Sequence, residues 1–181
     1  MSNGNVIERL WKLEATAKKL VLDGKRAPEQ LCDLLQKFID TATFSPLAFI
    51  GEGWLFAEAR NPRSAALVLL DDYSKVRLST DWLEGKSSID GETRRTRILA
   101  DTASTPLNTD HFLDLWNNKE KIPEEWKKVK GVITFDGDVF RSSGGRRCVL
   151  YLYWYVGGWR WYYRWLDNRW GALDPSAVLA S

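Results

Sequence analysis

The residues of this chain that could do acid–base chemistry are mostly carboxylates, and their spacing singles out no set. A glycosidase or a magnesium-dependent nuclease needs only two or three carboxylates that converge on one place. Asp136 and Asp138 flank a glycine, a pattern that we interpret as a hairpin turn. A carboxylate-dependent hydrolase therefore stays open as one alternative, with no residues assigned to it. The candidates are Glu52, Glu58, Asp71, Asp72, Glu92, Asp110, Asp114, Asp136 and Asp138.

The single histidine and the two cysteines limit the other kinds of site. His111 lies beside Asp110 at the expected start of a helix, where we expect it to be exposed and not catalytic. Cys32 and Cys148 lie in segments that look buried, which favours two free thiols in a reducing compartment over a disulfide. These three residues are too few for a structural zinc site. We expect no metal and no cofactor.

The glycine-rich run Ser142–Arg147 has two interpretations. Its backbone could form an anion-binding nest beside Arg146 and Arg147, or it could be a four-residue hairpin loop. The loop is the commoner meaning of such a run.

The chemically unusual part of the chain is aromatic. Half of the ten tryptophans lie between Trp154 and Trp170, in the run LYLYWYVGGWRWYYRWLDNRWGAL that starts at Leu150. Tryptophan is repeated this tightly where a surface needs large rigid contact area or a core needs mass. The run contains no serine, cysteine or histidine. It therefore favours a binding surface over most kinds of catalysis.

The glycine pair in this run predicts a β-hairpin. Gly157 and Gly158 can both hold the positive φ angles of a two-residue turn, and side chains alternate between the two faces of a strand. One face is then apolar and belongs against a core; it carries Leu150, Leu152, Trp154, Val156, Trp159, Trp161, Tyr163 and Trp165. The other is a ladder of tyrosines and arginines that suits water; it carries Tyr151, Tyr153, Tyr155, Arg160, Tyr162 and Arg164.

The tyrosine and arginine ladder has two explanations. Cation–π and aromatic pairs across a sheet contribute about 0.2–1 kcal/mol each, so the ladder could simply stabilise the hairpin. Tyrosine and arginine are also enriched at interface hot spots, and aromatic sheets with basic neighbours stack unpaired bases. The sequence leaves both explanations open.

The rest of the chain predicts mixed helix and strand. Residues 1–45 carry two amphipathic segments, 5–23 and 28–39, that predict a helical hairpin. Residues 46–130 form a mixed α/β centre, with expected helices at 91–100 and from Thr109, and short strands near 54–57 and 76–78. Residues 131–181 predict a Trp-rich antiparallel β-meander of about four strands. The expected fold is α+β, with the three regions packed as one globular unit.

Charge is spread unevenly over the 181 residues. The net charge is +2, but residues 127–181 carry nine Lys and Arg against four Asp, so +5, which leaves −3 on residues 1–126. The C-terminal part therefore suits an acidic protein face or a nucleic acid. No segment has the roughly 20 apolar residues of a membrane helix, and the first 20 residues lack a signal-peptide core. We expect a cytoplasmic protein without a membrane partner.

Several stretches together resemble one group of proteins. DGKRAPEQLCDLLQKFID, FLDLWNNKEKIPEEWK, FDGDVFRSSGGRRCVLYLYW and the ending PSAVLAS are similar to small uncharacterised bacterial proteins with a helical start and a Trp-rich tail. The resemblance covers most of the chain and implies no activity, so it assigns no residue a role. From the residues, the leading hypothesis is a non-catalytic interaction protein that docks a protein partner through the ladder. A single-stranded nucleic-acid binder using the same face is the main alternative.

Overall fold

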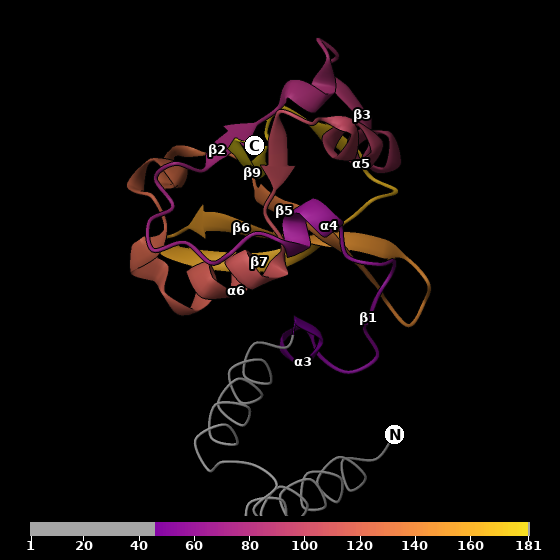
Figure 1. Cartoon of the computed structure of the whole chain (residues 1–181), viewed down its shortest axis with the longest axis horizontal. Coiled ribbons are helices and arrows are strands. Elements are labelled where there is room, and N and C mark those ends of the chain that lie inside the picture. The colour runs from indigo at the N-terminus through magenta and orange to yellow at the C-terminus, as the bar shows by residue number, and fades with distance from the viewer. Residues whose placement is uncertain (1–45, 181) are drawn as a thin grey trace, which may run out of the picture. The chain divides into compact units, whose positions relative to one another are not determined.

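The computed structural model describes residues 46–180, which belong to one compact unit, while residues 1–45 make up a second unit. The helical hairpin predicted for residues 1–45, with Cys32, lies outside the described residues. The described part combines helices with a multistranded sheet (Figure 1). The α+β class is confirmed for this part of the chain.

A seven-stranded sheet organises the molecule. Its main path runs β2-β9-β5-β6-β7, while β1 pairs with β5 and β4 pairs with β9. Every pairing in it is antiparallel except that of β5 with β9. The strands are β1 (Leu55–Phe56), β2 (Arg77–Ser79), β4 (Ser104–Pro106), β5 (Ile133–Arg141), β6 (Arg147–Tyr155), β7 (Gly158–Trp165) and β9 (Ser176–Ala180).

A second sheet of two strands pairs β3 (Ser88–Asp90) with β8 (Arg169–Gly171). The helical elements are α3 (Pro46–Ile50), α4 (Pro62–Ala65), α5 (Gly91–Ala100), α6 (Thr109–Asn117) and the 3-10 turns η1 (Asp81–Leu83), η2 (Lys119–Lys121) and η3 (Glu124–Lys128).

Local capping explains why the two longer helices begin where they do. The Asp90 carboxylate accepts the Thr93 backbone N–H at the start of α5. The side chain of Asn108 accepts backbone N–H groups in the first turn of α6. Both are N-cap residue types, so the predicted helices at these positions are confirmed. The cap of α6 is Asn108, however, and Thr109 is its first helical residue.

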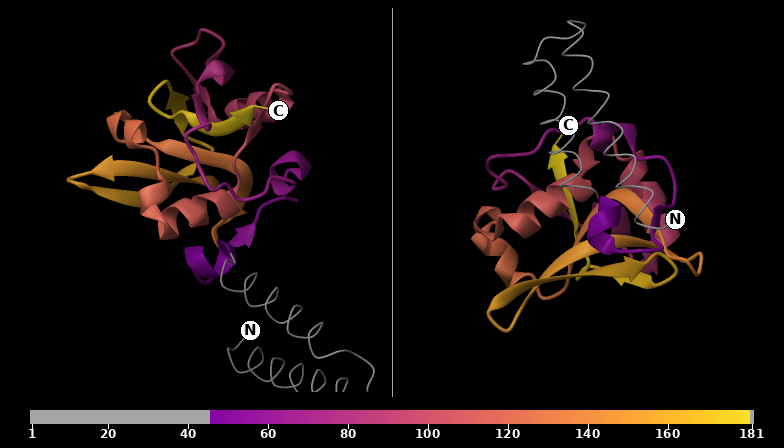
Figure 2. Two further views of the ribbon diagram at one scale, coloured as in Figure 1. Left: turned by 60° about the vertical axis from the view of Figure 1, so that its left-hand side comes forward. Right: turned by 90° about the horizontal axis from the view of Figure 1, so that it is seen from below.

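The sheet has a hydrophobic layer on each face. On one face, Phe112 of α6 packs against Phe135 of β5 with ring centroids 5.3 Å apart. On the other face, a cluster joins α5 and the small sheet to the large sheet; it contains Trp82, Leu83, Ile89, Ile98, Val139, Val149, Leu166 and Trp170. The C-terminal hairpin therefore lies between two layers at its base, whereas toward its tip α6 lies on one side only (Figure 2, right).

The predicted four-strand meander is only partly correct. Three antiparallel strands, β5, β6 and β7, do follow one another, but the two strands expected around Asp136-Gly137 are one continuous β5. Its pairing with β6 slips between Phe135 and Phe140, so Asp136–Val139 form a bulge opposite Val149 alone. Gly137 suits this bulge because a Cβ there would lie 2.8 Å from the Asn108 Cα atom. After β8, the chain returns to pair β9 with β5, a crossing that local pattern did not predict.

Candidate binding surface

The β6–β7 hairpin turns one residue earlier than the glycine pair predicted. Tyr155 pairs with Gly158, so the two turn residues are Val156 and Gly157, with φ angles of +46° and +74°. The predicted register, which placed Trp154 opposite Trp161, is wrong; Trp154 lies opposite Trp159. The partner of each residue changes by two positions. Because the side-chain period of a strand is also two, every residue keeps the face that was predicted for it.

The apolar face of the hairpin packs on α6 and α3 but is not fully covered. Leu150, Leu152 and Trp159 are buried, whereas Trp154 and Trp161 are half-buried. Trp161 contacts Phe49 of α3, with ring centroids 4.6 Å apart, and also contacts Phe112 and Trp116 of α6. The prediction that this face belongs to the core holds for Leu150, Leu152 and Trp159, whereas Trp154 and Trp161 are only partly covered.

The opposite face carries all six predicted binding residues, and we call it the tyrosine face: Tyr151, Tyr153, Tyr155, Arg160, Tyr162 and Arg164. Tyr155 and Tyr162 are the most exposed of its tyrosines, at 61% and 51%. Arg160 is exposed, while Tyr151, Tyr153 and Arg164 are half-buried. The structure therefore brings the predicted residues together on one partly accessible face.

The tyrosine rings form one continuous row. Tyr153 contacts Tyr155 and Tyr151 with centroids 6.5 and 5.7 Å apart, and Tyr151 contacts Tyr162 across the strands at 6.3 Å. The interplanar angles of these three contacts lie between 45° and 70°, so the rings meet obliquely instead of stacking in parallel. Such a row is a rigid amphipathic surface with its hydroxyl groups at the rim.

Two tyrosines of β7 and β6, Tyr163 on the apolar face and Tyr151 on the tyrosine face, have raised pKa values. Burial, followed by the nearby Tyr153, raises the pKa of Tyr151 above its usual 10. The hydrogen bond from the Tyr162 hydroxyl, followed by burial, raises the pKa of Tyr163 in the same direction. The charged side chains among the six residues of the tyrosine face are Arg160 and Arg164.

The two arginines of the tyrosine face have different surroundings. Arg164 forms an ion pair with Asp174 at 3.1 Å, donates to the Arg169 carbonyl at 2.9 Å, and lies over the Trp170 ring at 4.8 Å. Arg160 donates only to the Trp159 carbonyl next to it, at 3.4 Å, and has no carboxylate partner within residues 46–180. Arg164 is thus held by the fold, and Arg160 is the cation that the described part leaves available.

The carboxylates of β5 are buried and bound to arginines, contrary to the turn predicted for them. Asp136 pairs with Arg94, and both side chains are fully buried. The Asp138 carboxylate accepts two hydrogen bonds from Arg60, at 2.8 and 2.9 Å, and the Thr109 backbone N–H at 2.9 Å. Carboxylates neutralised in this way in a core are structural partners and offer no open pair to a substrate.

Three carboxylates that were not among the predicted hydrolase candidates line a cavity of about 350 Å³ beside α5 and β9. Asp81, Glu84 and Asp101 belong to its wall, and Arg77, Arg97 and Ser104 respectively engage them. The Arg77 hydrogen bond lowers the pKa of Asp81, and that of Ser104 lowers the pKa of Asp101. A general acid needs a raised pKa, so Asp81 and Asp101 do not suit that role.

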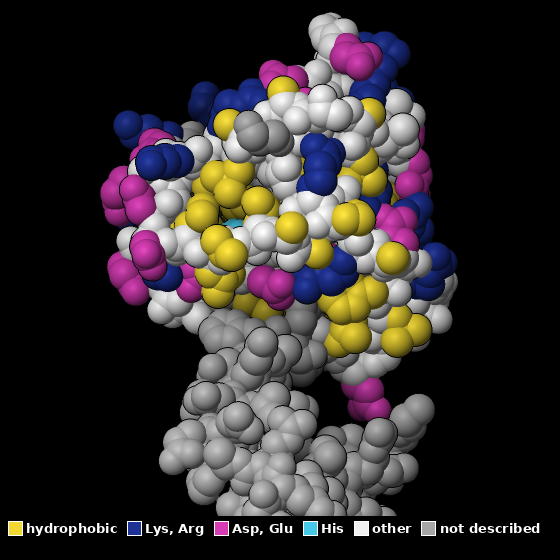
Figure 3. Space-filling model, viewed as in Figure 1, with side chains coloured by type: hydrophobic (Ala, Val, Ile, Leu, Met, Phe, Trp, Pro, Cys, Tyr) yellow, Lys and Arg dark blue, Asp and Glu magenta, His cyan; other side chains and the backbone are white. Residues whose placement is uncertain are grey.

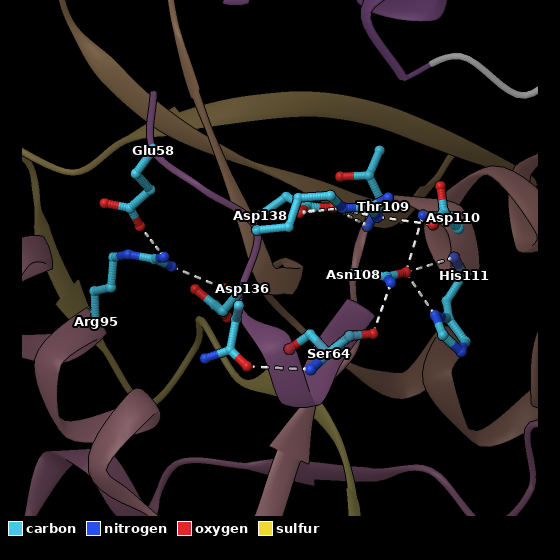
Figure 4. Close-up of polar contacts among 11 residues, drawn as sticks. Glu58, Ser64, Arg95, Asn108, Thr109, Asp110, His111, Asp136 and Asp138 are labelled. Carbon is cyan, nitrogen blue, oxygen red and sulfur yellow. Dashed lines mark hydrogen bonds and ion pairs between the residues drawn. The ribbon is translucent and has the colours of Figure 1, made fainter. Parts of the chain in front are cut away.

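His111 is fully buried, which contradicts the prediction of an exposed helix-start histidine. Its Nδ1 lies 2.7 Å from Asn108 Oδ1 and its Nε2 lies 3.1 Å from the Val68 carbonyl oxygen. Burial lowers its pKa below 6.5, although the Val68 hydrogen bond opposes this. The buried imidazole thus links Val68, in the segment after α4, to Asn108, the cap of α6. Figure 4 shows the contact between His111 and Asn108.

The glycine-rich run is a hairpin loop. Gly145 N–H donates to the Ser142 carbonyl at 2.9 Å, and the adjacent arginines have carboxylate partners, Asp167 for Arg146 and Glu92 for Arg147. The anion-nest interpretation finds no support in this arrangement.

Comparisons with protein families, with curated proteins and with solved structures found no match for this chain. Within residues 46–180, no group of three or more His, Cys, Asp and Glu side chains is arranged to hold a metal ion. The helices of this part of the chain are all too short or too polar to cross a membrane.

Sequence reasoning missed the residues that support the tyrosine face from below. Trp170 and Asp174 engage Arg164, and both belong to the segment that follows β7. No local signal links them to Arg164, because the contact depends on how the chain returns beneath the hairpin.

Proposed function

We propose that this protein is a non-catalytic interaction protein that docks a macromolecular partner through the tyrosine face. The observation that carries the proposal is the exposure of Tyr155, Arg160 and Tyr162 side by side on a rigid hairpin. Exposed tyrosine and arginine side chains on rigid elements contribute large contact area at a low cost in side-chain entropy.

A protein partner is favoured over a single-stranded nucleic acid. A nucleic-acid strand needs a row of cations along its phosphates and open ring faces for its bases. Arg160 is the only arginine of the tyrosine face without a carboxylate among the described residues. The tyrosine rings already cover one another: those of Tyr151, Tyr153 and Tyr155 meet obliquely, and that of Tyr162 stacks on Tyr163 with centroids 4.2 Å apart. Binding to a protein surface requires neither a row of cations nor ring faces that are open for stacking.

The test compares two double variants of the full-length chain. Tyr155→Ala with Tyr162→Ala removes the most exposed tyrosines, and Leu55→Ala with Leu173→Ala removes exposed apolar side chains, 62% and 59% accessible, elsewhere. Binding is measured to a partner purified from the source cells. A single hot-spot contact is worth about 2 kcal/mol, so even if only one of the two tyrosines is a hot spot the variant should bind about thirtyfold more weakly. The leucine variant should bind as the wild type does.

Equal binding of both variants would show that the tyrosine row serves stability alone. A single-stranded oligothymidylate provides the nucleic-acid comparison. Tight, salt-dependent binding of this oligonucleotide that the tyrosine variant loses would assign the face to nucleic acid instead.

A further inference from the structure

We propose that the partner binds as an extended, acidic strand that adds to the free edge of β7. This inference rests on the proposed function and names the kind of segment that the surface takes. It starts from the place of β7 in the sheet: β7 ends the strand order, and within residues 46–180 its only pairing partner is β6.

The hairpin register shows which backbone groups of β7 are free. The Leu166 N–H donates to the Arg147 carbonyl at 2.9 Å, so Leu166 directs its backbone groups toward β6. Antiparallel pairs alternate between bonded and non-bonded positions. The N–H and C=O groups of the odd-numbered residues, Trp159, Trp161, Tyr163 and Trp165, therefore point away from β6, toward the open edge. Two of these carbonyls have further contacts: that of Trp165 accepts the Asn168 N–H, and that of Trp159 accepts Arg160 Nη1.

The side chains along this edge have incomplete neighbours on both faces. On the apolar face, Trp161, Tyr163 and Trp165 remain half-buried although Phe49 contacts the first and Trp54 contacts the other two. On the tyrosine face, Tyr162 and Arg160 are exposed. A strand laid along β7 would place side chains over both rows, because its residues alternate in the same way as those of β7.

Charge decides which strand fits. Between Gly158 and Trp165 the edge carries two arginines and no acidic residue. Asp174 already neutralises Arg164, whereas Arg160 has no carboxylate partner in the described part of the chain. A segment with an acidic residue opposite Arg160 and apolar residues over Trp161 and Tyr163 matches this pattern. A second copy of β7 would bring two more arginines to this edge. If the two copies paired along their full length, Arg160 of each would lie opposite Arg164 of the other, and the like charges would repel.

The probe is an acetylated and amidated nonapeptide, Thr-Val-Glu-Val-Thr-Val-Glu-Val-Thr, whose glutamates repeat the four-residue spacing of the two arginines. When it pairs with β7, the valine amides point toward the edge and the glutamate and threonine amides point away. One derivative carries N-methyl groups on the valine amides, and another carries them on the glutamate and threonine amides. A third peptide has lysine in place of glutamate.

Binding of these peptides to the full-length chain is measured by calorimetry at low salt. We expect the glutamate peptide to bind and the valine-methylated derivative to lose at least about tenfold in affinity, since a blocked edge hydrogen bond removes strand addition. The other methylated derivative should bind like the parent. Arg160→Glu should reject the glutamate peptide and accept the lysine peptide, while Arg141→Glu, at an exposed position near the other end of the hairpin, should change neither.

Failure of this inference can be told apart from failure of the proposed function. If the purified partner loses binding with Tyr155→Ala and Tyr162→Ala but is not displaced by the glutamate peptide, the tyrosine face stands and strand addition is overturned. Equal binding of both methylated derivatives also overturns strand addition. Concentration-dependent dimers that the peptide does not dissociate would assign the edge to a second copy, against the inference. Loss of the tyrosine effect itself overturns the proposed function.

Discussion

At the scale of single residues, environment separates side chains of the same type. Arg160 and Arg164 lie on one face of one strand, yet only Arg164 is fixed by an ion pair, a carbonyl and an indole ring. An alanine substitution at Arg164 would therefore disturb folding as well as the surface, because it leaves Asp174 without its partner. Arg160 is the position at which a substitution tests binding alone.

His111 makes stability depend on pH. Burial holds its folded pKa below the usual 6.5 of the unfolded chain, so the unfolded chain binds the proton more tightly. The stability that neutral His111 contributes is complete above about pH 6.5 and is lost as the pH falls from there toward the folded pKa. We expect the free energy of unfolding of the wild type to drop more steeply below pH 6.5 than that of His111→Gln.

The measurement is urea unfolding of both proteins between pH 7.5 and 5. The carboxylates are common to the two proteins, so their difference isolates the imidazole. A wild type that gains stability over His111→Gln on acidification would mean that the imidazolium is the bound form, held by the Val68 carbonyl and the nearby Asp110 and Asp114.

At the scale of elements, the C-terminal hairpin stores strain in its turn. Val156 adopts φ +46° and is 81% exposed. A β-branched residue therefore holds a left-handed backbone conformation without buried side-chain contacts that would compensate for its cost. Residues other than glycine, asparagine and aspartate pay about 1–2 kcal/mol in this region. The turn nonetheless lies at Val156 and Gly157, because Gly157 supplies the second positive φ. The side chains of the flanking strands remain on the apolar face and the tyrosine face.

Val156→Asn should stabilise the protein by about 1 kcal/mol, since asparagine followed by glycine is the preferred pair for such a turn. The melting temperature should rise accordingly. Val68→Asn is the matched control, because Val68 is 78% exposed and is absent from the positive-φ positions of the described chain. A rise of the same size in the control would point to solubility and not to turn strain.

At the scale of the whole molecule, Arg94 ties the two sheets together. Its guanidinium lies over the rings of Trp82 and Trp170, at 4.7 and 4.3 Å, and donates to Asp136 and to Thr134 of β5. Burial alone would raise the pKa of Asp136, but the charge and hydrogen bonds of Arg94, with those of Ser176 and Thr134, hold it below its usual value. One buried ion pair thus joins α5 to the small sheet and to the large sheet.

Arg94→Met should lower the free energy of unfolding by about 3–5 kcal/mol, because it leaves the Asp136 carboxylate buried without its partner. Arg77→Met, which breaks an exposed pair with Asp81, should cost less than about 1 kcal/mol. Urea unfolding is followed by circular dichroism, since Trp82 and Trp170 fluorescence would report the substitution locally. Similar losses in the two variants would contradict the linking role of Arg94.

The sequence by itself determined the features that depend on residues close together along the chain. Helices were predicted over 91–100 and from Thr109, and both exist, although the cap of the second is Asn108. The two-residue period separated the tyrosine face from the apolar face even though the turn was misplaced by one position. These features hold because hydrogen bonds within one turn and side-chain alternation are local. When each residue of β6 pairs with a β7 residue two positions away from the predicted one, every side chain still lies on its predicted face.

Only the tertiary structure decided which distant groups meet. An Asp-Gly pair predicts a turn when it is considered alone, yet Asp136 and Asp138 remain in β5 because Arg94 and Arg60 reach them from other elements. The same long-range packing buries His111 and distinguishes Arg164 from Arg160. Burial and charge pairing depend on how separate segments come together, and that information lies in the packing of the whole chain.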